Sequence, residues 1–175
     1  MCDISVGIIS HCQPLRFNRV RFNWVSMTQT APFTTLDQQL CFEVYAASHA
    51  FTKFYKPLLD PLGLTYPQYL VMLLLWQRDD RAVGDLGQAL SLESSTLTPL
   101  LKRMEASGQI TRQRDPEDER RVRIRLTDAG RALQDQAATI PACLGEAAAM
   151  PASEVTELRE EVRRLRLRLE AALAG

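Results

Sequence analysis

One cysteine and two tyrosines in a predicted amphipathic helix are the residues whose types and spacing best suit chemistry. Cys41 lies in the run LCFEVY at residues 40–45, so Tyr45 follows it at i+4 on the same helical face. The reactive form of a cysteine is the thiolate, which requires the thiol pKa to fall from about 8.5. Because no Lys or Arg lies within one turn of Cys41, phenol hydroxyls that hydrogen-bond to the sulfur are the available means of favouring the thiolate.

The second tyrosine, Tyr55, is too far along the same helix to reach this cysteine. It lies 14 residues after Cys41, about 21 Å along a straight helix. Contact therefore requires the Tyr55 of a partner subunit, with this helix packed antiparallel across a dimer axis. The structural alternative is a buried thiol for Cys41 and core filling for both Tyr45 and Tyr55.

Composition places the chain among ordinary globular proteins. The 175 residues are 46% hydrophobic and 24% charged, with zero formal net charge. Residues 102–131 nevertheless hold nine basic against six acidic side chains, as expected of a local phosphate-contacting surface. The longest apolar run, residues 69–76, is shorter than the roughly 20 residues that span a bilayer. Four scattered cysteines without a Cys-x-x-Cys pair, and two distant histidines, predict a cytoplasmic protein with no metal or cofactor.

Residues 1–26 differ from the rest of the sequence. They carry Arg16, Arg19 and Arg21 against the single acid Asp3, without helical periodicity. A secretory signal is a poor fit, because these arginines follow the apolar stretch. We expect a disordered tail or a start codon placed upstream of Met27, in which case the cysteines at positions 2 and 12 have no role.

The periodicity of the remaining chain predicts a fixed order of elements. We expect helices over residues 35–59, 66–76, 83–90 and 96–107, then strands over residues 109–114 and 122–126 that flank a charged hairpin. Pro57 and Pro61 should break or kink the end of the first helix, and Gly63 allows a stop. Residues 65–68, Thr-Tyr-Pro-Gln, form a capping box for the second helix. A polar turn is predicted at residues 78–81, and Ser94 and Ser95 should cap the fourth helix. Thr127 should cap a long helix that extends to about residue 149, followed by a last helix from residue 151 with a short a/d repeat.

This order is typical of a winged helix-turn-helix, a mainly α fold with a small β-wing. The helix that begins near Ser94 would enter the major groove and the wing an adjacent minor groove. The predicted DNA contacts are hydroxyls and cations of this helix and residues of the wing tip, where we expect Asp118 to brace one arginine. The alternatives are helix capping, solvated surface and ion pairing for Ser94, Ser95, Thr96, Thr98, Lys102, Arg103, Asp118, Arg120 and Arg121.

Several motifs support a family resemblance from about residue 35 to the C-terminus. The wing reads Asp118-Glu119-Arg120, followed by a strand and Leu-Thr-Asp-Ala-Gly at residues 126–130. Other segments are LCF at 40–42, YKPLLD at 55–60, TYPQY at 65–69 and TLTPLLKRME at 96–105. The sequence resembles the MarR family of dimeric winged-helix regulators, and within it the OhrR repressors, which sense organic hydroperoxides.

The resemblance implies a homodimer that binds a palindromic double-stranded DNA operator when reduced. An organic hydroperoxide would oxidise Cys41, and the dimer would release the DNA. In two-cysteine members, a second cysteine on the helix after the wing resolves the first one in an intersubunit disulfide. Cys143 lies where that resolving cysteine is expected, although it is also compatible with a small core residue in an Ala-rich helix.

The predicted organisation assigns residues 67–126 to the DNA-binding region and residues 35–66 and 127–175 to helical dimerisation. Residues 1–34 would be a disordered or mis-assigned extension. We expect no enzymatic turnover, because no nucleotide loop or catalytic triad is visible. Two alternatives are a MarR-type repressor relieved by a phenolic or aromatic ligand and, disfavoured by the arginine-rich second strand, a thiol peroxidase.

Overall fold

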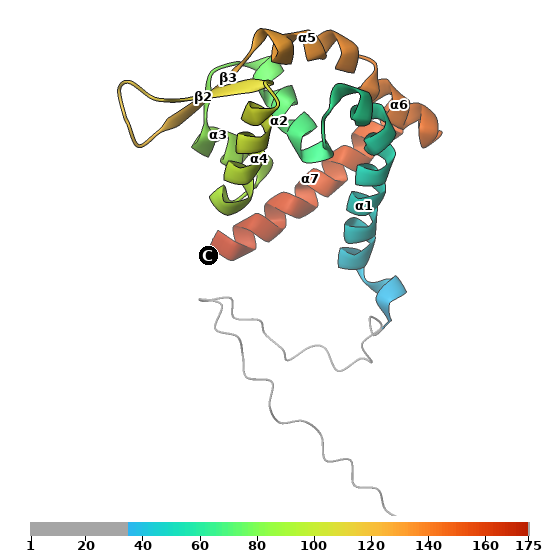
Figure 1. Ribbon diagram of the computed structural model, residues 1–175. Helices are drawn as coiled ribbons and strands as arrows, with labels where there is room; N and C mark the ends of the chain where they lie inside the picture. The colour runs from blue at the N-terminus through green and yellow to red at the C-terminus, as the bar shows by residue number, and fades with distance from the viewer. Residues whose placement is uncertain (1–34, 175) are drawn as a thin grey trace, which may run out of the picture. The chain divides into compact units, whose positions relative to one another are not determined.

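The computed structural model describes residues 35–174, which form seven α-helices and three strands (Figure 1). Of the described residues, 35–149 form one compact unit, and the C-terminal helix belongs to a second unit. The expectations for residues 1–26 and their two cysteines lie outside the described part of the chain. The helices are α1 (Leu40–Leu59), α2 (Tyr66–Gln77), α3 (Val83–Leu90), α4 (Ser94–Ala106), α5 (Asp128–Ala137), α6 (Ile140–Ala147) and α7 (Ala152–Ala174).

A proline-rich corner connects α1 to α2. The predicted break at the end of the first helix is confirmed, because α1 ends at Leu59, two residues after Pro57, and Pro61 lies in the 3-10 helix that follows. A 3-10 helix over residues 60–62 then ends at Gly63, whose φ of 64° is left-handed, as predicted for a stop. The predicted capping box is confirmed, because the Thr65 N–H donates to Gln68 Oε1 at 2.8 Å.

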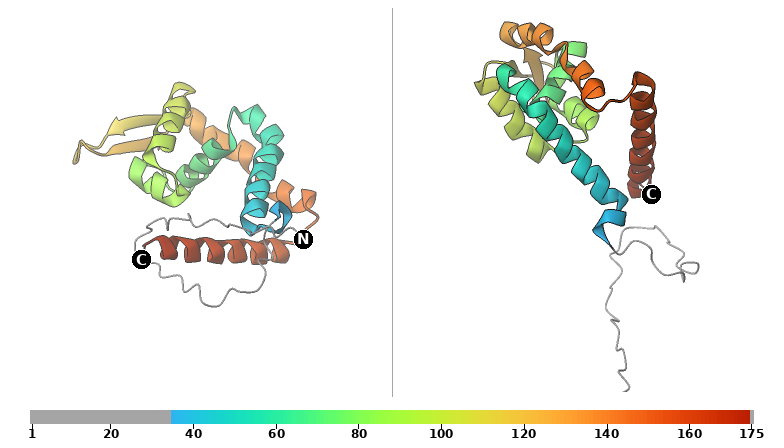
Figure 2. Two further views of the ribbon diagram at one scale, coloured as in Figure 1. Left: turned by 90° about the horizontal axis from the view of Figure 1, so that it is seen from below. Right: turned by 90° about the vertical axis from the view of Figure 1, so that its right-hand side faces the viewer.

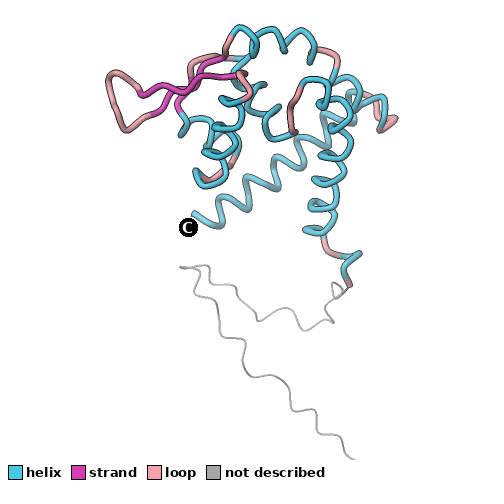
Figure 3. The backbone as a smooth tube through the Cα atoms, in the orientation of Figure 1, coloured by secondary structure: helices cyan, strands magenta, loops and turns pink. Residues whose placement is uncertain are grey.

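The wing is a three-stranded antiparallel sheet in the order β1-β3-β2. Strands β2 (Ile110–Arg114) and β3 (Val122–Leu126) match the predicted hairpin, which projects beyond α3 and α4 (Figures 2 and 3). The third strand, β1 (Arg81–Ala82), pairs Arg81 with Ile124, where the sequence predicted only a polar turn. Two residues are too few to show the alternation of apolar and polar side chains that predicts a strand, so β1 can be recognised only from its pairing with β3.

Helices α3 and α4 form the helix-turn-helix. The bounds of α3 agree with the prediction, and the turn passes through Ser91 at a φ of 53°. Helix α4 begins at Ser94 with Glu93 as N-cap, so the prediction that Ser94 and Ser95 cap a helix that begins at Thr96 is wrong. One face of α4 is buried in the core through Leu97, Leu100, Leu101 and Met104.

The prediction of one long helix after the wing is wrong, because the structure has two helices there. The segment is divided at residues 138–139 into α5 and α6, with Pro141 in the first turn of α6. A proline cannot donate its backbone nitrogen, and its ring clashes with the carbonyl four residues earlier, so one continuous helix is unfavourable here. The cap at Thr127 is confirmed, because its hydroxyl accepts the Gly130 N–H at 3.0 Å.

Gly130 joins the wing to the helices at close range. Its carbonyl accepts a hydrogen bond from Trp76 Nε1 at 3.0 Å, which ties α2 to the start of α5. A Cβ atom at this position would lie 2.0 Å from the Gln109 carbonyl oxygen, so only glycine fits. That oxygen in turn accepts the Thr127 N–H at 3.2 Å, which fixes the approach of the two segments.

Helix α7 starts where the sequence predicts and carries an apolar stripe. Leu158, Val162 and Leu169 of its a/d repeat are about half exposed within the single chain. Such a stripe requires a partner. Among the described residues, no single helix has the length and apolar character to cross a membrane; one bent pair, residues 40–62 with α2 at 67°, meets the length and composition criteria alone.

Candidate nucleic-acid interface and redox site

Three tyrosines meet where the end of α1 packs on α2. The ring centroid of Tyr55 lies 4.9 Å from that of Tyr66 and 6.0 Å from that of Tyr69. Burial raises the pKa of each phenol, and at Tyr55 the neighbouring Tyr66 and the thiol of Cys143 raise it further. These hydroxyls therefore stay protonated at neutral pH, as a hydrogen-bond donor to a thiolate must.

The two candidate redox cysteines lie at opposite ends of α1. Cys143 is half-buried on α6, and its thiol lies 3.5 Å from the carbonyl oxygen of Thr139. It is close enough to Tyr55 to raise the pKa of that phenol. Cys41 is exposed in the first turn of α1, about 21 Å along the axis from Tyr55. A disulfide needs Cα atoms within about 7 Å, so the fold separates these two thiols within one chain.

The surroundings of Cys41 are apolar and exposed. The side chains of Leu40 and Tyr45 are 63% and 62% exposed, and Val44 and Phe51 on the same helix are also exposed. The ring of Tyr45 packs edge-on against His49, with centroids 4.4 Å apart. The Cys41 thiol has no hydrogen-bond partner among the described residues of its own chain.

The predicted DNA contacts of α4 lie on its outward surface, opposite the buried leucines. Thr98 is half-buried and the others are exposed. This surface combines short hydroxyls with cations, which suits phosphate oxygens and base edges. The exposed residues are Ser94, Ser95, Thr96, Lys102 and Arg103.

Asp118 organises the wing tip through the backbone. Its carboxylate accepts the Arg120 N–H at 3.1 Å, and its carbonyl accepts the Arg121 N–H at 2.8 Å. The expected brace therefore acts on the main chain of Arg120 and not on its guanidinium. Neither Arg120 nor Arg121 has an ion pair within 4.0 Å in the part of the chain that the structure describes. Both guanidinium groups are exposed and available to an anion.

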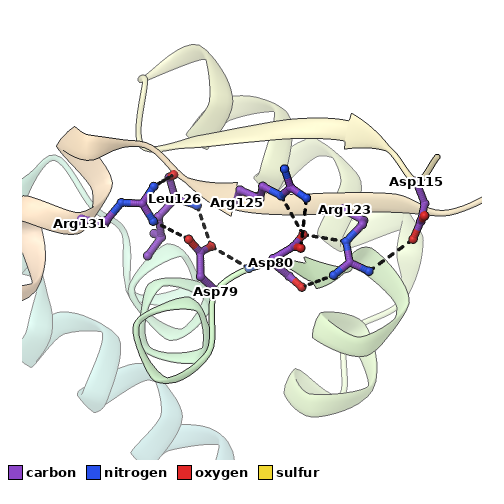
Figure 4. A network of polar contacts seen from close by, with 7 residues as sticks. All are labelled: Asp79, Asp80, Asp115, Arg123, Arg125, Leu126 and Arg131. Atoms are coloured by element: carbon purple, nitrogen blue, oxygen red, sulfur yellow. Dashed lines mark hydrogen bonds and ion pairs between the residues drawn. The ribbon is translucent and has the colours of Figure 1, made fainter. Parts of the chain in front are cut away.

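Two consecutive aspartates hold the base of the wing (Figure 4). Asp80 accepts Arg123 Nε at 2.7 Å and Arg125 Nε at 3.0 Å, and the other edge of Arg123 reaches Asp115 at 3.3 Å. Hydrogen bonds from Arg123 and Arg125 hold the pKa of Asp80 well below its usual range. Asp80 adopts a left-handed φ of 57°, which points its carboxylate at β3.

The preceding aspartate connects the same turn to α5. Asp79 accepts the Leu126 N–H at 2.9 Å, and its second oxygen contacts Arg131 Nη1 at 2.5 Å. Arg131 also donates to the Leu126 carbonyl at 3.0 Å. The turn between α2 and β1 therefore couples the strand of the wing to the helix that follows it.

The chain is similar to several known regulators. Residues 53–137 match the family described as transcriptional regulator SarA/Rot. The organic hydroperoxide resistance transcriptional regulator of Bacillus subtilis is 56% identical over 106 residues, which cover 61% of this chain and 72% of that protein. The HTH-type transcriptional regulator TtmR of Methylorubrum extorquens is 48% identical over 137 residues, which cover 78% and 70% of the two chains. The chain belongs to the MarR family of winged-helix transcriptional regulators.

Solved structures agree with this MarR assignment. Reduced AbfR bound to DNA matches with a TM-score of 0.68 at 36% identity, over 79% of this chain and 94% of that one. Disulfide-formed AbfR matches with a TM-score of 0.55 at 38% identity, over 74% and 91% of the chains. AbfR is a protein of Staphylococcus epidermidis. The predicted fold and family are therefore confirmed, and the chain is a transcriptional regulator of the OhrR type.

Reasoning from the sequence missed residues that the structure brings to these sites. Tyr66 contacts Tyr55, whereas the sequence predicts for it only a place in the capping box and in a motif of the family resemblance. Its position within the Thr-Tyr-Pro-Gln segment was the available signal. Asp79 and Asp80 had been read as a polar turn, and no local pattern indicates that their partners lie more than 40 residues later.

Proposed function

We propose that the protein is a homodimeric repressor that binds double-stranded operator DNA when reduced and leaves it when an organic hydroperoxide oxidises Cys41. The observation that carries this proposal is the division of one redox site between the two ends of α1. An exposed cysteine lies at one end, and phenols with a second cysteine lie at the other. If the two α1 helices of a dimer pack antiparallel, Cys41 of each subunit would lie beside Tyr55 and Cys143 of the other, so the dimer would contain two such sites.

In this dimer, Cys41 of one subunit would face Tyr55, Tyr66 and Cys143 of the other, with Tyr45 as a donor from its own helix. The exposed apolar side chains of α1 would be covered by the partner and would favour a hydroperoxide with a hydrocarbon group. Protonated phenols would donate hydrogen bonds to the thiolate and stabilise it. The apolar stripe of α7 would add to the same dimer interface.

The chemistry proceeds in two balanced steps. The Cys41 thiolate attacks the terminal peroxide oxygen; the S–O bond forms, the O–O bond breaks, and the alkoxide takes a proton to leave as an alcohol. Sulfur loses two electrons and the peroxide gains them. The Cys143 thiol of the partner subunit then attacks the sulfenic sulfur, which forms a disulfide and releases water. Because the disulfide joins α1 to α6, its formation would shift the helices that carry the wings.

DNA binding would use the exposed surface of α4 and the wing tip. The hydroxyls and cations of α4 would enter the major groove, and Arg120 and Arg121 would reach the flanking minor groove. The backbone brace from Asp118 would present these arginines. Residues 102–131 carry the excess of positive charge that attracts DNA phosphates, although the chain as a whole has zero formal net charge.

A release experiment tests the proposal. A labelled duplex is selected from a random-sequence pool with the reduced protein, and fluorescence anisotropy is followed while cumene hydroperoxide is added. We expect the wild-type protein to release the duplex and Cys41→Ser to retain it. Cys143→Ser, the matched cysteine control, should still react at Cys41 without forming a covalent dimer. Release from Cys41→Ser at the wild-type peroxide concentration would refute the sensor.

An apolar pocket favours one alternative function. A cavity of about 330 Å³ lies between α2 and the α5–α6 segment, lined by Tyr69, Leu73, Trp76 and Pro141 among others. An aromatic ligand bound there would contact Trp76, whose indole also holds the Gly130 carbonyl at the end of the wing. Release by benzoate that is unaffected by Cys41→Ser would support this ligand-relieved repressor.

A further inference from the structure

A second cluster of arginines lies away from the outward surface of α4. A cavity of about 500 Å³ opens between the turn after α2, helix α3 and the base of the wing. We call it the arginine pocket, and its charged lining consists of Arg78, Arg81, Arg121, Arg123, Asp80 and Asp85. The four arginines and two aspartates leave a surplus of two positive charges.

The ion pairs within the pocket do not neutralise this surplus of positive charge. Arg123 is committed to Asp80 and Asp115, and Asp80 is also neutralised by Arg125 outside the lining. The Arg81 Nε–H donates to the Arg78 carbonyl at 3.1 Å, so the two terminal nitrogens of Arg81 remain able to bind an anion.

Arg78 and Arg81 can therefore take a further anion, and Arg121, which the proposed function directs to the minor groove, adds positive charge to the same cavity. Arg78, Arg81 and Arg121 have no ion pair within 4.0 Å among the described residues. They come from two separate segments of the chain, because Arg81 is the first residue of β1, Arg78 lies three residues before it, and Arg121 immediately precedes β3. Guanidinium groups that converge in this way suit a phosphate, which they bind through paired N–H donors.

The position of the pocket indicates where that phosphate comes from. The pocket lies between α3 of the helix-turn-helix and the base of the wing. In a winged helix the helix-turn-helix and the wing contact neighbouring parts of one duplex, so the DNA backbone that connects these contacts would run close to the region between the two elements. We propose that the arginine pocket binds a phosphodiester of the DNA backbone between the major groove read by α4 and the minor groove reached by the wing. This inference rests on the proposed DNA binding and adds a contact that positions the duplex without reading its sequence.

The test compares Arg78→Gln/Arg81→Gln with Arg78→Lys/Arg81→Lys, a control that keeps both charges at the same positions. Binding to the duplex selected by the reduced wild-type protein is measured from low to high potassium chloride. Each lost phosphate contact lowers the slope of log affinity against log salt by about 0.9. We expect the glutamine variant to lose about one to two units of slope, to weaken equally on a scrambled duplex, and to keep its thermal midpoint. The lysine variant should regain most of the slope.

The outcomes separate this inference from the proposed function. An unchanged slope in the glutamine variant, with tight binding by the wild-type protein, would overturn the pocket and leave the repressor intact. Absence of DNA binding by the wild-type protein would overturn both. A third arm titrates inorganic phosphate into the DNA-free protein; binding that the glutamine variant loses without any change in the salt slope would assign the pocket to a free anion and contradict the proposal.

Discussion

Asp80 is a single residue on which the orientation of the wing depends. Its carboxylate binds two arginines of β3, and its backbone carbonyl accepts a third contact from Arg123 Nη2 at 2.7 Å. The left-handed φ of this residue is tolerated by aspartate better than by bulkier side chains. The side chain therefore links a turn after α2 to a strand more than 40 residues later.

Asp80→Asn should change the dependence of stability on pH. The folded-state pKa of Asp80 is lowered, so its ion pairs stabilise the protein above the unfolded pKa of about 3.9 and are lost as the pH falls below it. We expect the variant to be less stable by about 1 kcal/mol at neutral pH, given the partial exposure of the carboxylate. Its loss of stability from about pH 5 to pH 2 should be smaller than in the wild type. Urea unfolding across this range measures both effects, with the exposed Asp85→Asn as control.

Gly130→Ala should destabilise the protein because no space exists for a methyl group. The added Cβ would lie 2.0 Å from the Gln109 carbonyl oxygen, and overpacking of this kind costs about 1–3 kcal/mol. Gly84→Ala is the matched control, since a Cβ at that position in α3 meets no atom within 4 Å and alanine favours a helix. Equal urea midpoints for the two variants would contradict the close packing at Gly130.

At the scale of elements, the junction of α1, α2 and α6 should control the reactivity of Cys41. A charge-assisted hydrogen bond contributes about 1.5–3 kcal/mol, so the loss of this donor to the thiolate in Tyr55→Phe should slow oxidation of Cys41 at least about tenfold at neutral pH. The rate should recover as the pH rises and the thiolate forms without help. Stopped-flow measurement with cumene hydroperoxide over a pH series tests this; Tyr69→Phe serves as the control within the cluster. A uniform loss of rate at every pH would point to a structural role.

The elements also show how far the sequence predicts the fold. The capping box at Thr65, the stop at Gly63 and the hairpin β2–β3 depend on local signals, and each was predicted. Strand β1 and the contacts of Asp80 depend on partners far along the chain, so no local pattern indicates them. The division of α5 from α6 could have been inferred from Pro141, but the Ala-rich composition on both sides favours one helix.

The candidate site was likewise predictable only where it depends on local spacing along one helix. The spacing of Cys41 and Tyr55 along α1 indicates that they cannot meet within one chain, and the structure keeps that separation. The neighbourhood of Tyr55 with Tyr66 and Cys143 arises from packing of α1 on the next helix, α2, and on α6, which lies far along the chain. The arginine pocket likewise combines residues about 40 positions apart.

For the whole molecule, the proposed dimer should depend on the apolar stripe of α7. Leu158→Lys places a charge on this stripe, whereas Glu157→Lys places the same side chain at a position outside the repeat. Burial of one leucine contributes about 1.5–3 kcal/mol, and the symmetric dimer contains the substitution twice. We expect Leu158→Lys to raise the dimer dissociation constant at least about a hundredfold, as measured by sedimentation equilibrium. Equal dissociation constants for the two variants would exclude α7 from the interface.

The most direct test of the whole account is the covalent product of oxidation. The reduced protein is treated with a slight excess of cumene hydroperoxide, separated on a non-reducing gel, and the cross-linked peptides are identified by mass spectrometry. We predict a covalent dimer whose disulfide joins Cys41 of one subunit to Cys143 of the other, and its absence in Cys41→Ser and Cys143→Ser. A Cys41 that remains an unmodified thiol while the peroxide is present would contradict the sensor and favour a repressor relieved by a bound ligand.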